Sequence, residues 1–327
     1  MTAGQTTTTA PVSIAQVSPA QWIAYSIMAA VAAGSLVGWF LVIRRMRRGV
    51  DPLPFEPRPP ITWTGAEALL VVCAYVVSQS MAGALAQWAY LRDLVEAAPV
   101  AIGAGGPAAS IAEKLSPLPL LLQGKVVGDV LFLLTALVIF RFARPTPREQ
   151  IGLATRPSFD LRAGLGAFVM IVPPVILVQA GLSELMGESV HPVLVGLKNS
   201  RDGVLWVWSA VAVLVTAPLL EEFLFRGVIQ NWLSRAWSFA AEPQVTAAGE
   251  IVPPSAWGVA FAHDGPIVAT AGFFALVHLG NGPDPIPLFF LALGLGYLFR
   301  QTNRIWAGWI VHLMLNLFSL AALPLGL

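Results

Sequence analysis

Two neighbouring glutamates, Glu221 and Glu222, lie at the end of an apolar run that begins at Val204 and is long enough to cross a membrane. Adjacent residues of a helix point about 100° apart, so the two carboxylates face different surroundings. Arg226 follows Glu222 by four residues, the spacing at which side chains meet on one helix face. We therefore predict a structural ion pair between Glu222 and Arg226, which leaves Glu221 freer to face the helix bundle.

Two histidines and an asparagine in other apolar runs extend this set of polar groups. His278 lies near the end of one run, and His312 and Asn316 are four residues apart on one face of the last run. A single histidine in an apolar helix is usually a packing residue, and one His–Asn pair can simply bridge two helices. Several such groups in three membrane helices need a shared hydrated interior, because ionisable side chains are costly in lipid.

These residue types suit two mechanisms that both end in amide hydrolysis. In the first, Glu221 is a general base for an attacking water, and His312 and Asn316 donate to the oxyanion. In the second, Glu221, His278 and His312 bind Zn²⁺ and leave a position open for a water. The spacing differs from the H-E-x-x-H of soluble zinc proteases, so the sequence alone leaves open whether the cofactor is Zn²⁺ or none.

Three further polar residues are weaker candidates. Asp129 lies in an apolar run, where it either bonds to another helix or lines the cavity. His191 and His263 lie beside Pro192 and Asp264, and we interpret both histidines as solvated loop residues.

The elements that must position the candidate residues are membrane helices. The chain has 327 residues, of which 56% are hydrophobic and 11% charged, with a mean hydropathy of +0.72. This composition excludes an ordinary soluble domain and predicts an all-α, polytopic transmembrane helix bundle. We expect about eight membrane helices, of which the third, sixth and seventh are short: Trp22–Ile43, Ala66–Leu91, Val126–Phe142, Gly164–Leu182, Val204–Arg226, Gly265–Leu279, Ile286–Phe299 and Ile305–Leu323.

The chain divides into three parts by composition. Residues 1–20 form a polar, flexible tail, residues 21–160 hold the N-terminal membrane helices and linkers, and residues 161–327 form the candidate core. Prolines predict an extended linker at Asp51–Pro60 and argue against a continuous helix over Ala236–Trp257.

The distribution of arginine predicts the orientation in the membrane. Four arginines between positions 44 and 48 follow the first apolar run, which therefore stays as an anchor with its C-terminal end in the cytoplasm. Alternation from there places both termini outside, in a multi-pass protein of the cell (inner) membrane. The net charge of +1 argues against a nucleic-acid partner and leaves the lipid bilayer and membrane-associated peptides as partners.

Three short motifs carry a resemblance to a known family. They are EEFLFRG from Glu221 to Gly227, FALVH from Phe274 to His278, and HLMLN from His312 to Asn316. In this order they match the patterns EExxxR, FxxxH and HxxxN of the CPBP family, which comprises type II CAAX prenyl proteases and bacteriocin-processing or immunity proteins. The resemblance covers residues 217–320, about a third of the chain.

The resemblance implies an intramembrane endopeptidase and a role for each motif residue. Glu221 and His278 would activate the water, and His312 with Asn316 would stabilise the oxyanion or complete a metal site. Glu222 and Arg226 would support them. The family is often labelled metalloprotease, yet a metal-free glutamate mechanism has been argued for it. We favour the metal-free version, because an Asn paired with a His makes a better donor set than a ligand set.

Two other classes of function remain as alternatives. A non-catalytic scaffold or immunity protein would keep the fold and bind a partner in the membrane, but it would not need all four polar groups. A transporter or proton relay also uses intramembrane Glu and His, but we find neither an inverted repeat nor paired broken helices in the sequence. For the enzyme, a membrane-anchored peptide is the expected substrate and a prenylated C-terminus is the best-known example in the family.

Overall fold

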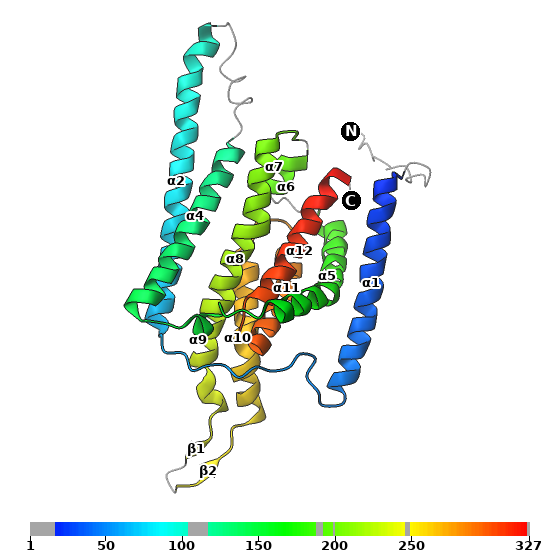
Figure 1. Cartoon of the computed structure of the whole chain (residues 1–327), viewed down its shortest axis with the longest axis vertical. Coiled ribbons are helices and arrows are strands. Elements are labelled where there is room, and N and C mark those ends of the chain that lie inside the picture. Colours follow the sequence, from blue (N-terminus) through cyan, green and yellow to red (C-terminus); the bar gives the residue numbers. More distant parts are fainter. Residues whose placement is uncertain (1–16, 104–116, 188–191, 199, 246–248, 326–327) are drawn as a thin grey trace, which may run out of the picture.

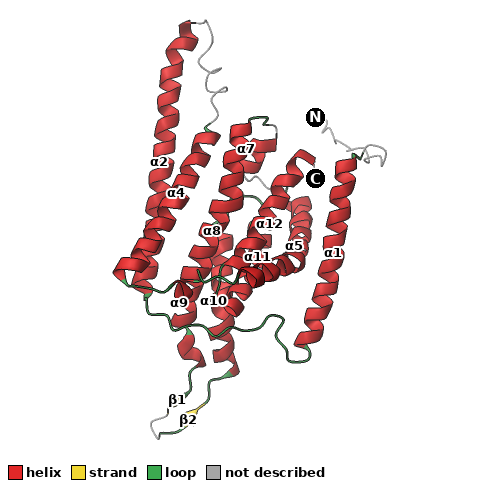
Figure 2. Ribbon diagram, viewed as in Figure 1, coloured by secondary structure: helices red, strands yellow, loops and turns green. Residues whose placement is uncertain are grey.

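The computed structural model describes residues 17–103, 117–187, 192–198, 200–245 and 249–325. These residues form a bundle of long helices, and their only strands are a short hairpin, as Figure 2 shows. The predicted all-α, polytopic class is therefore confirmed. Most of the predicted N-terminal tail and His191 lie outside the described residues.

Seven helical stretches of the described residues are long and apolar enough to cross a membrane, so the protein is an integral membrane protein. The spans are Pro19–Met46 (α1), Gly65–Glu96 (within α2, Gly65–Gly103), Leu118–Ala143 (α4, Leu118–Val138, with the π-helix η2, Ile139–Ala143), Pro157–Met186 (α5), Gly203–Ala236, Ala256–Leu276 (α10) and Trp306–Leu325 (α12, Trp306–Ala322, with η7, Leu323–Leu325). The span Gly203–Ala236 runs through five consecutive elements: α7 (Gly203–Ala210), the π-helix η4 (Val211–Thr216), α8 (Ala217–Glu222), the π-helix η5 (Phe223–Gln230) and α9 (Asn231–Ala236).

We expected about eight membrane helices, and the described residues contain seven that are long and apolar enough to span a membrane. The seventh predicted segment, Ile286–Phe299, does form a helix, α11 (Pro285–Thr302), but the last turn of this helix holds Arg300, Gln301 and Thr302. Half of its 18 residues are buried, and it packs against α5, α10 and α12. α11 is therefore an inner helix of the bundle, covered by protein on several sides.

The connections at the two ends of the bundle contain the remaining short elements (Figure 1). The 3₁₀ helix η6 (Ser238–Ala241) precedes strands β1 (Gln244–Val245) and β2 (Ile251–Val252), which pair antiparallel in the proline-bearing segment where we expected no continuous helix. A 3₁₀ helix, η3 (Arg148–Ile151), precedes α5, and α6 (Pro192–Lys198) precedes α7. The start of α1 and the end of α12 lie at the end of the bundle opposite the hairpin, as Figure 1 shows.

The sixth membrane helix begins earlier than its composition indicated. α10 starts at Ala256, where Ser255 caps it by accepting from the Gly258 amide, so His263 lies in a helix and its interpretation as a loop residue was wrong. α10 continues through Pro266 and ends at Leu276. His278 consequently follows the helix in a turn.

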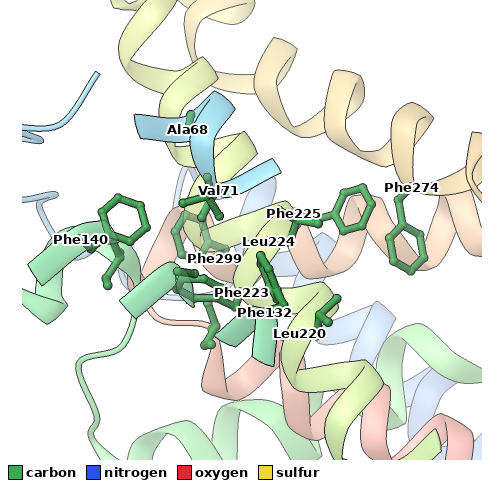
Figure 3. Packing of buried hydrophobic residues seen from close by; sticks show 14 of the residues in the cluster. Ala68, Val71, Phe132, Phe140, Leu220, Phe223, Leu224, Phe225, Phe274 and Phe299 are labelled. Atoms are coloured by element: carbon green, nitrogen blue, oxygen red, sulfur yellow. The ribbon is translucent and has the colours of Figure 1, made fainter. Parts of the chain in front are cut away.

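Aromatic rings fill the core beside the candidate site, as Figure 3 shows. Phe223 packs against Phe132 of α4 and Phe140 of η2, with ring centroids 6.2 and 6.4 Å apart. On the other side, the rings of Phe225 and Phe274 meet edge to face at 5.0 Å. The π-helix η5 is thereby anchored on both sides, and seven of its eight residues are buried.

The N-terminal helix α1 is hydrogen-bonded to a backbone carbonyl of α5 that a proline leaves without its helical partner. Pro174 has no N–H, so the carbonyl of Met170, four residues earlier, lacks its usual helical partner. Ser35 Oγ and Trp39 Nε1 of α1 donate to this carbonyl at 3.3 and 2.9 Å. Gly34 allows the close approach, because a Cβ there would meet Val169 at 3.1 Å.

The extended linker 51–60 is fastened to the turn between α11 and α12. The carboxylate of Glu56 accepts from Arg304 and, at 2.8 Å, from Arg156. Arg304 Nε also donates to Asp160 at 2.7 Å, so this buried arginine joins the linker to α5. The hydrogen bond from Arg304 holds the pKa of Glu56 below its ordinary value.

This depressed pKa predicts a pH-dependent contribution of Glu56 to stability. The contribution is present above the ordinary pKa of 4.5 and is lost as the pH falls through the lower pKa of the folded state. Glu56→Gln should therefore lower the thermal midpoint in detergent at pH 7, and the difference from wild type should shrink toward about pH 3. Glu149→Gln is the control, because Glu149 is exposed and pairs only with its neighbour Arg148. A difference that is constant over this pH range would contradict the prediction.

Candidate active site

The predicted ion pair of the two-glutamate motif is present and completely buried. Arg226 Nε lies 3.5 Å from Glu222 Oε2, and the two side chains are 1% and 0% exposed. The pair lies where α8 passes into η5, within the helical stretch Gly203–Ala236. A buried charge within a membrane helix needs an opposite charge beside it, and Glu222 and Arg226 provide this for each other.

His312 of α12 lies between the two carboxylates. Its Nε2 is 3.7 Å from Glu221 Oε2, and its Nδ1 is 3.9 Å from Glu222 Oε1. The side chain of Glu221 is 22% exposed, whereas that of Glu222 is inaccessible. The prediction that the neighbouring glutamates face different surroundings is therefore correct, and Glu221 is the one that a reactant can reach.

Phe274 links the three motifs, although we had not selected it as a site residue. The guanidinium carbon of Arg226 lies 5.2 Å from its ring centroid, within the range of a cation–π interaction. The same ring lies 4.8 Å from the ring of His278 and 6.1 Å from that of His312. Phe274 thus contacts one residue from each of the three motifs. The only signal for it in the sequence was its place in the FxxxH pattern.

His278 is oriented by the last turn of α10. Its Nδ1 lies 2.7 Å from the carbonyl oxygen of Phe274. A carbonyl can only accept, so this contact is a hydrogen bond when Nδ1 carries the proton. In that tautomer Nε2 has a free lone pair and can accept a proton.

Asn316 lies one turn beyond His312 and contacts the helix that carries the glutamates. Its Nδ2 donates to the carbonyl oxygen of Val213 at 2.8 Å. Val213 belongs to the π-helix η4, whose widened turn disturbs the regular pairing of backbone carbonyls. Asn316 has a second N–H, so this contact does not use up its capacity to donate.

Asp129 bonds to other helices, which was the first of its two predicted roles. It is fully buried, and its carboxylate accepts from Thr216 Oγ1 of η4 at 2.7 Å and from Gln79 Nε2 of α2 at 3.1 Å. It also pairs with Lys125 one turn before it on α4. Asp129 and Asn316 therefore hold η4 from opposite neighbours, directly ahead of Glu221.

Gly308 of α12 makes room for the buried carboxylate. A Cβ at this position would lie 2.5 Å from Glu222 Oε2, far inside van der Waals contact. No pattern in the sequence identified this residue, because a glycine in an apolar helix usually indicates only close helix packing.

We predict that Gly308→Ala disturbs the site through this contact. Alanine favours a helix over glycine by up to about 1 kcal/mol, but overpacking costs about 1–3 kcal/mol, so we expect net destabilisation. The matched control is Gly272→Ala on α10, where a Cβ meets nothing within 4 Å. Thermal unfolding in detergent should show Gly308→Ala below and Gly272→Ala at or above wild type. Equal midpoints for the two variants would rule out this role of Gly308.

The arrangement does not fit the predicted three-ligand zinc site. Among the described residues, no group of three or more His, Cys, Asp or Glu side chains is placed to hold a metal ion. His312 Nε2 lies 3.7 Å from Glu221, but Nδ1 of His278 is engaged with the backbone carbonyl oxygen of Phe274 at 2.7 Å. The description as a metalloprotease therefore lacks support from these side chains, and we derive no step through a metal.

The comparisons with known proteins agree with the motifs. No curated protein and no solved structure matches the chain. One family model, described as "Type II CAAX prenyl endopeptidase Rce1-like", matches residues 203–318, which include all seven signature residues of the three motifs. The resemblance to the CPBP family is thereby confirmed for residues 203–318, which are similar to the Rce1-like type II CAAX prenyl endopeptidases.

Proposed function

We propose that the protein is an intramembrane endopeptidase that hydrolyses a peptide bond of a membrane-associated protein or peptide. The main observation behind this proposal is the position of His312 between two carboxylates. Its Nε2 lies 3.7 Å from the accessible Glu221, and its Nδ1 lies 3.9 Å from the buried Glu222. Purely structural packing would not require an accessible glutamate beside a buried ion pair in a membrane helix. The family match supports the same class of reaction.

In the proposed reaction, Glu221 takes a proton from a water while the water oxygen bonds to the carbonyl carbon of the substrate. The negative charge that develops on the carbonyl oxygen is stabilised by the second N–H of Asn316 and by His312, which donates from Nε2 when both of its ring nitrogens carry a proton. The carbon–nitrogen bond then breaks as Glu221 passes the proton taken from the water to the leaving nitrogen, which regenerates the carboxylate. His278, whose Nε2 is free when Nδ1 bonds to Phe274, assists the activation of the water.

The buried pair has a supporting role in this proposal. Glu222 does not take the proton from the attacking water, because its side chain is inaccessible and paired with Arg226. Its negative charge instead lies 3.9 Å from His312 Nδ1, where it favours a proton on that nitrogen and fixes the orientation of the ring. His312 Nε2 is consequently directed at Glu221.

The proposed core comprises residues 161–327, and the membrane helices within 21–160 support it from outside the matched segment. A substrate helix hides its amides in its own hydrogen bonds, so the scissile segment must unwind to reach Glu221. We propose that the arginine-rich end of the bundle, at the β1–β2 hairpin, faces the cytoplasm and that the membrane is the cell (inner) membrane.

The first test is a cleavage assay with purified protein and a panel of prenylated and unprenylated membrane peptides, each with and without a chelator. His278→Ala should lose cleavage, whereas His263→Ala, which changes an exposed histidine of α10, should retain it. Chelator sensitivity would overturn the metal-free mechanism and leave the peptidase. Absence of cleavage by folded wild-type protein on the whole panel would favour the scaffold alternative.

A further inference from the structure

A second site lies at the hairpin end of the bundle, away from the candidate active site. A cavity of about 710 Å³ opens between the linker after α1, the end of α11, the segment 234–241 and the first turns of α10. His263 on its wall lies fifteen residues before His278, or about 22 Å along a helix at 1.5 Å per residue. The cavity is therefore separate from the glutamate motif.

Arg58 is the unusual residue in the wall of this cavity. Its Nε donates to Asn303 Oδ1 at 2.9 Å, and its guanidinium carbon lies 5.5 Å from the ring centroid of Phe299. Among the described residues, no carboxylate forms an ion pair with it. Burial, together with the positive charge of Arg300, lowers the pKa of Arg58 to about 10. Two cations that face one cavity repel each other unless an anion lies between them.

The other charged groups of the wall leave Arg58 uncompensated. Arg300 pairs with Asp264, so that the charge of each is already balanced. Asp51, the remaining carboxylate of the wall, is exposed and forms no ion pair with a described residue. Arg58 is partly buried, and a charged guanidinium that is partly removed from water is stabilised by a hydrogen-bonded anion. No carboxylate within the described part of the chain supplies one to Arg58.

We propose that this cavity binds a phosphate group of an anionic lipid, with Arg58 as the principal donor. A guanidinium presents its donors in a planar fork that matches phosphate, and basic pockets beside membrane helices bind anionic headgroups. The wall also contains the apolar residues Phe55, Val259 and Ala260, which can pack against the glycerol and the first acyl carbons. α10 begins its membrane span in this wall, which places the cavity at the depth of the headgroups.

The test measures the shift in thermal midpoint of the purified protein in detergent when phosphatidylglycerol, phosphatidylcholine or inorganic phosphate is added. A ligand of the folded state raises the midpoint in proportion to its affinity. We expect phosphatidylglycerol to raise it, phosphatidylcholine to have little effect, and Arg58→Gln to weaken binding of phosphatidylglycerol about tenfold. A similar, Arg58-dependent shift with inorganic phosphate would identify a soluble phosphate compound as the source of the same group.

Two further variants keep the test decisive. Arg141→Gln removes an exposed arginine from outside the cavity, so it controls for general attraction to anionic lipid and should keep the full shift. Ala260→Trp should place a bulky ring in the cavity and reduce the shift while Arg58 remains in place, which covers the case in which Arg58→Gln fails to fold. Equal shifts for wild type, Arg58→Gln and Ala260→Trp would overturn the proposal.

Discussion

Replacing Glu221 with glutamine should lower kcat for peptide cleavage by about 10²–10⁴-fold, the usual contribution of a general base, while the protein stays folded. Glutamine has nearly the same shape but cannot take a proton from water. The contact of Glu221 with His312 is 3.7 Å long, and the side chain is partly exposed, so little stability depends on it. Cleavage kinetics and the thermal midpoint, measured on the same preparation, separate these two effects.

The control for this substitution is Glu184→Gln, which replaces a carboxylate with a carboxamide in the same way at an exposed glutamate of α5. It should leave both kcat and the thermal midpoint unchanged. Full activity of Glu221→Gln on a peptide that the wild type cleaves would sink the assignment of Glu221 as the base. A large fall in the thermal midpoint would instead show that Glu221 has a structural role.

The sequence predicted the membrane class and most helices because these depend on composition and on local spacing. Twenty apolar residues span a bilayer wherever they occur, and residues four apart share a helix face in any fold. The Glu222–Arg226 pair is such a local feature, and the structure contains it. Local composition does not show how deeply a helix is buried, as α11 illustrates. Polar residues in its last turn make the helix less apolar than the membrane spans, although protein covers it on several sides.

The parts of the site that sequence reasoning missed depend on contacts between distant segments. Phe274 is one of many phenylalanines until its ring is placed against Arg226 and both histidines. Gly308 becomes significant only because Glu222 lies against the backbone of another helix. The bonds of Asp129 to Thr216 likewise follow from how α4 and η4 pack, which no spacing along the chain records.

The same packing explains how α4, which lies outside the matched segment, contributes to the candidate site. Thr216 donates a hydrogen bond to Asp129 of α4, and the Val213 carbonyl accepts one from Asn316 of α12. Thr216 and Val213 both belong to the π-helix η4, which precedes Glu221. A π-helical turn changes the direction in which every later side chain of the helix points. Asp129 therefore helps to set which way Glu221 and Glu222 face, although it lies far from them in sequence.

Replacing Arg226 with methionine should be the most destabilising single exchange at the site, with a loss of about 3–5 kcal/mol in the free energy of unfolding. Methionine keeps the length of the side chain but removes the charge, so Glu222 is left as an unpaired, inaccessible carboxylate. The contact with the ring of Phe274 loses its cation–π component as well. The measurement is the free energy of unfolding in mixed micelles, with Arg148→Met as the control, since that arginine is 73% exposed.

A second exchange shows whether the loss comes from the unpaired charge or from altered packing. Glu222→Gln combined with Arg226→Met removes both charges, and replacing both partners of a buried pair costs much less than removing one. We therefore expect the double variant to recover most of the lost stability. It should still cleave peptides more slowly than wild type, because His312 loses the carboxylate 3.9 Å from its Nδ1 and with it the orientation toward Glu221. A double variant as unstable as Arg226→Met alone would assign the loss to packing against Phe274 rather than to charge.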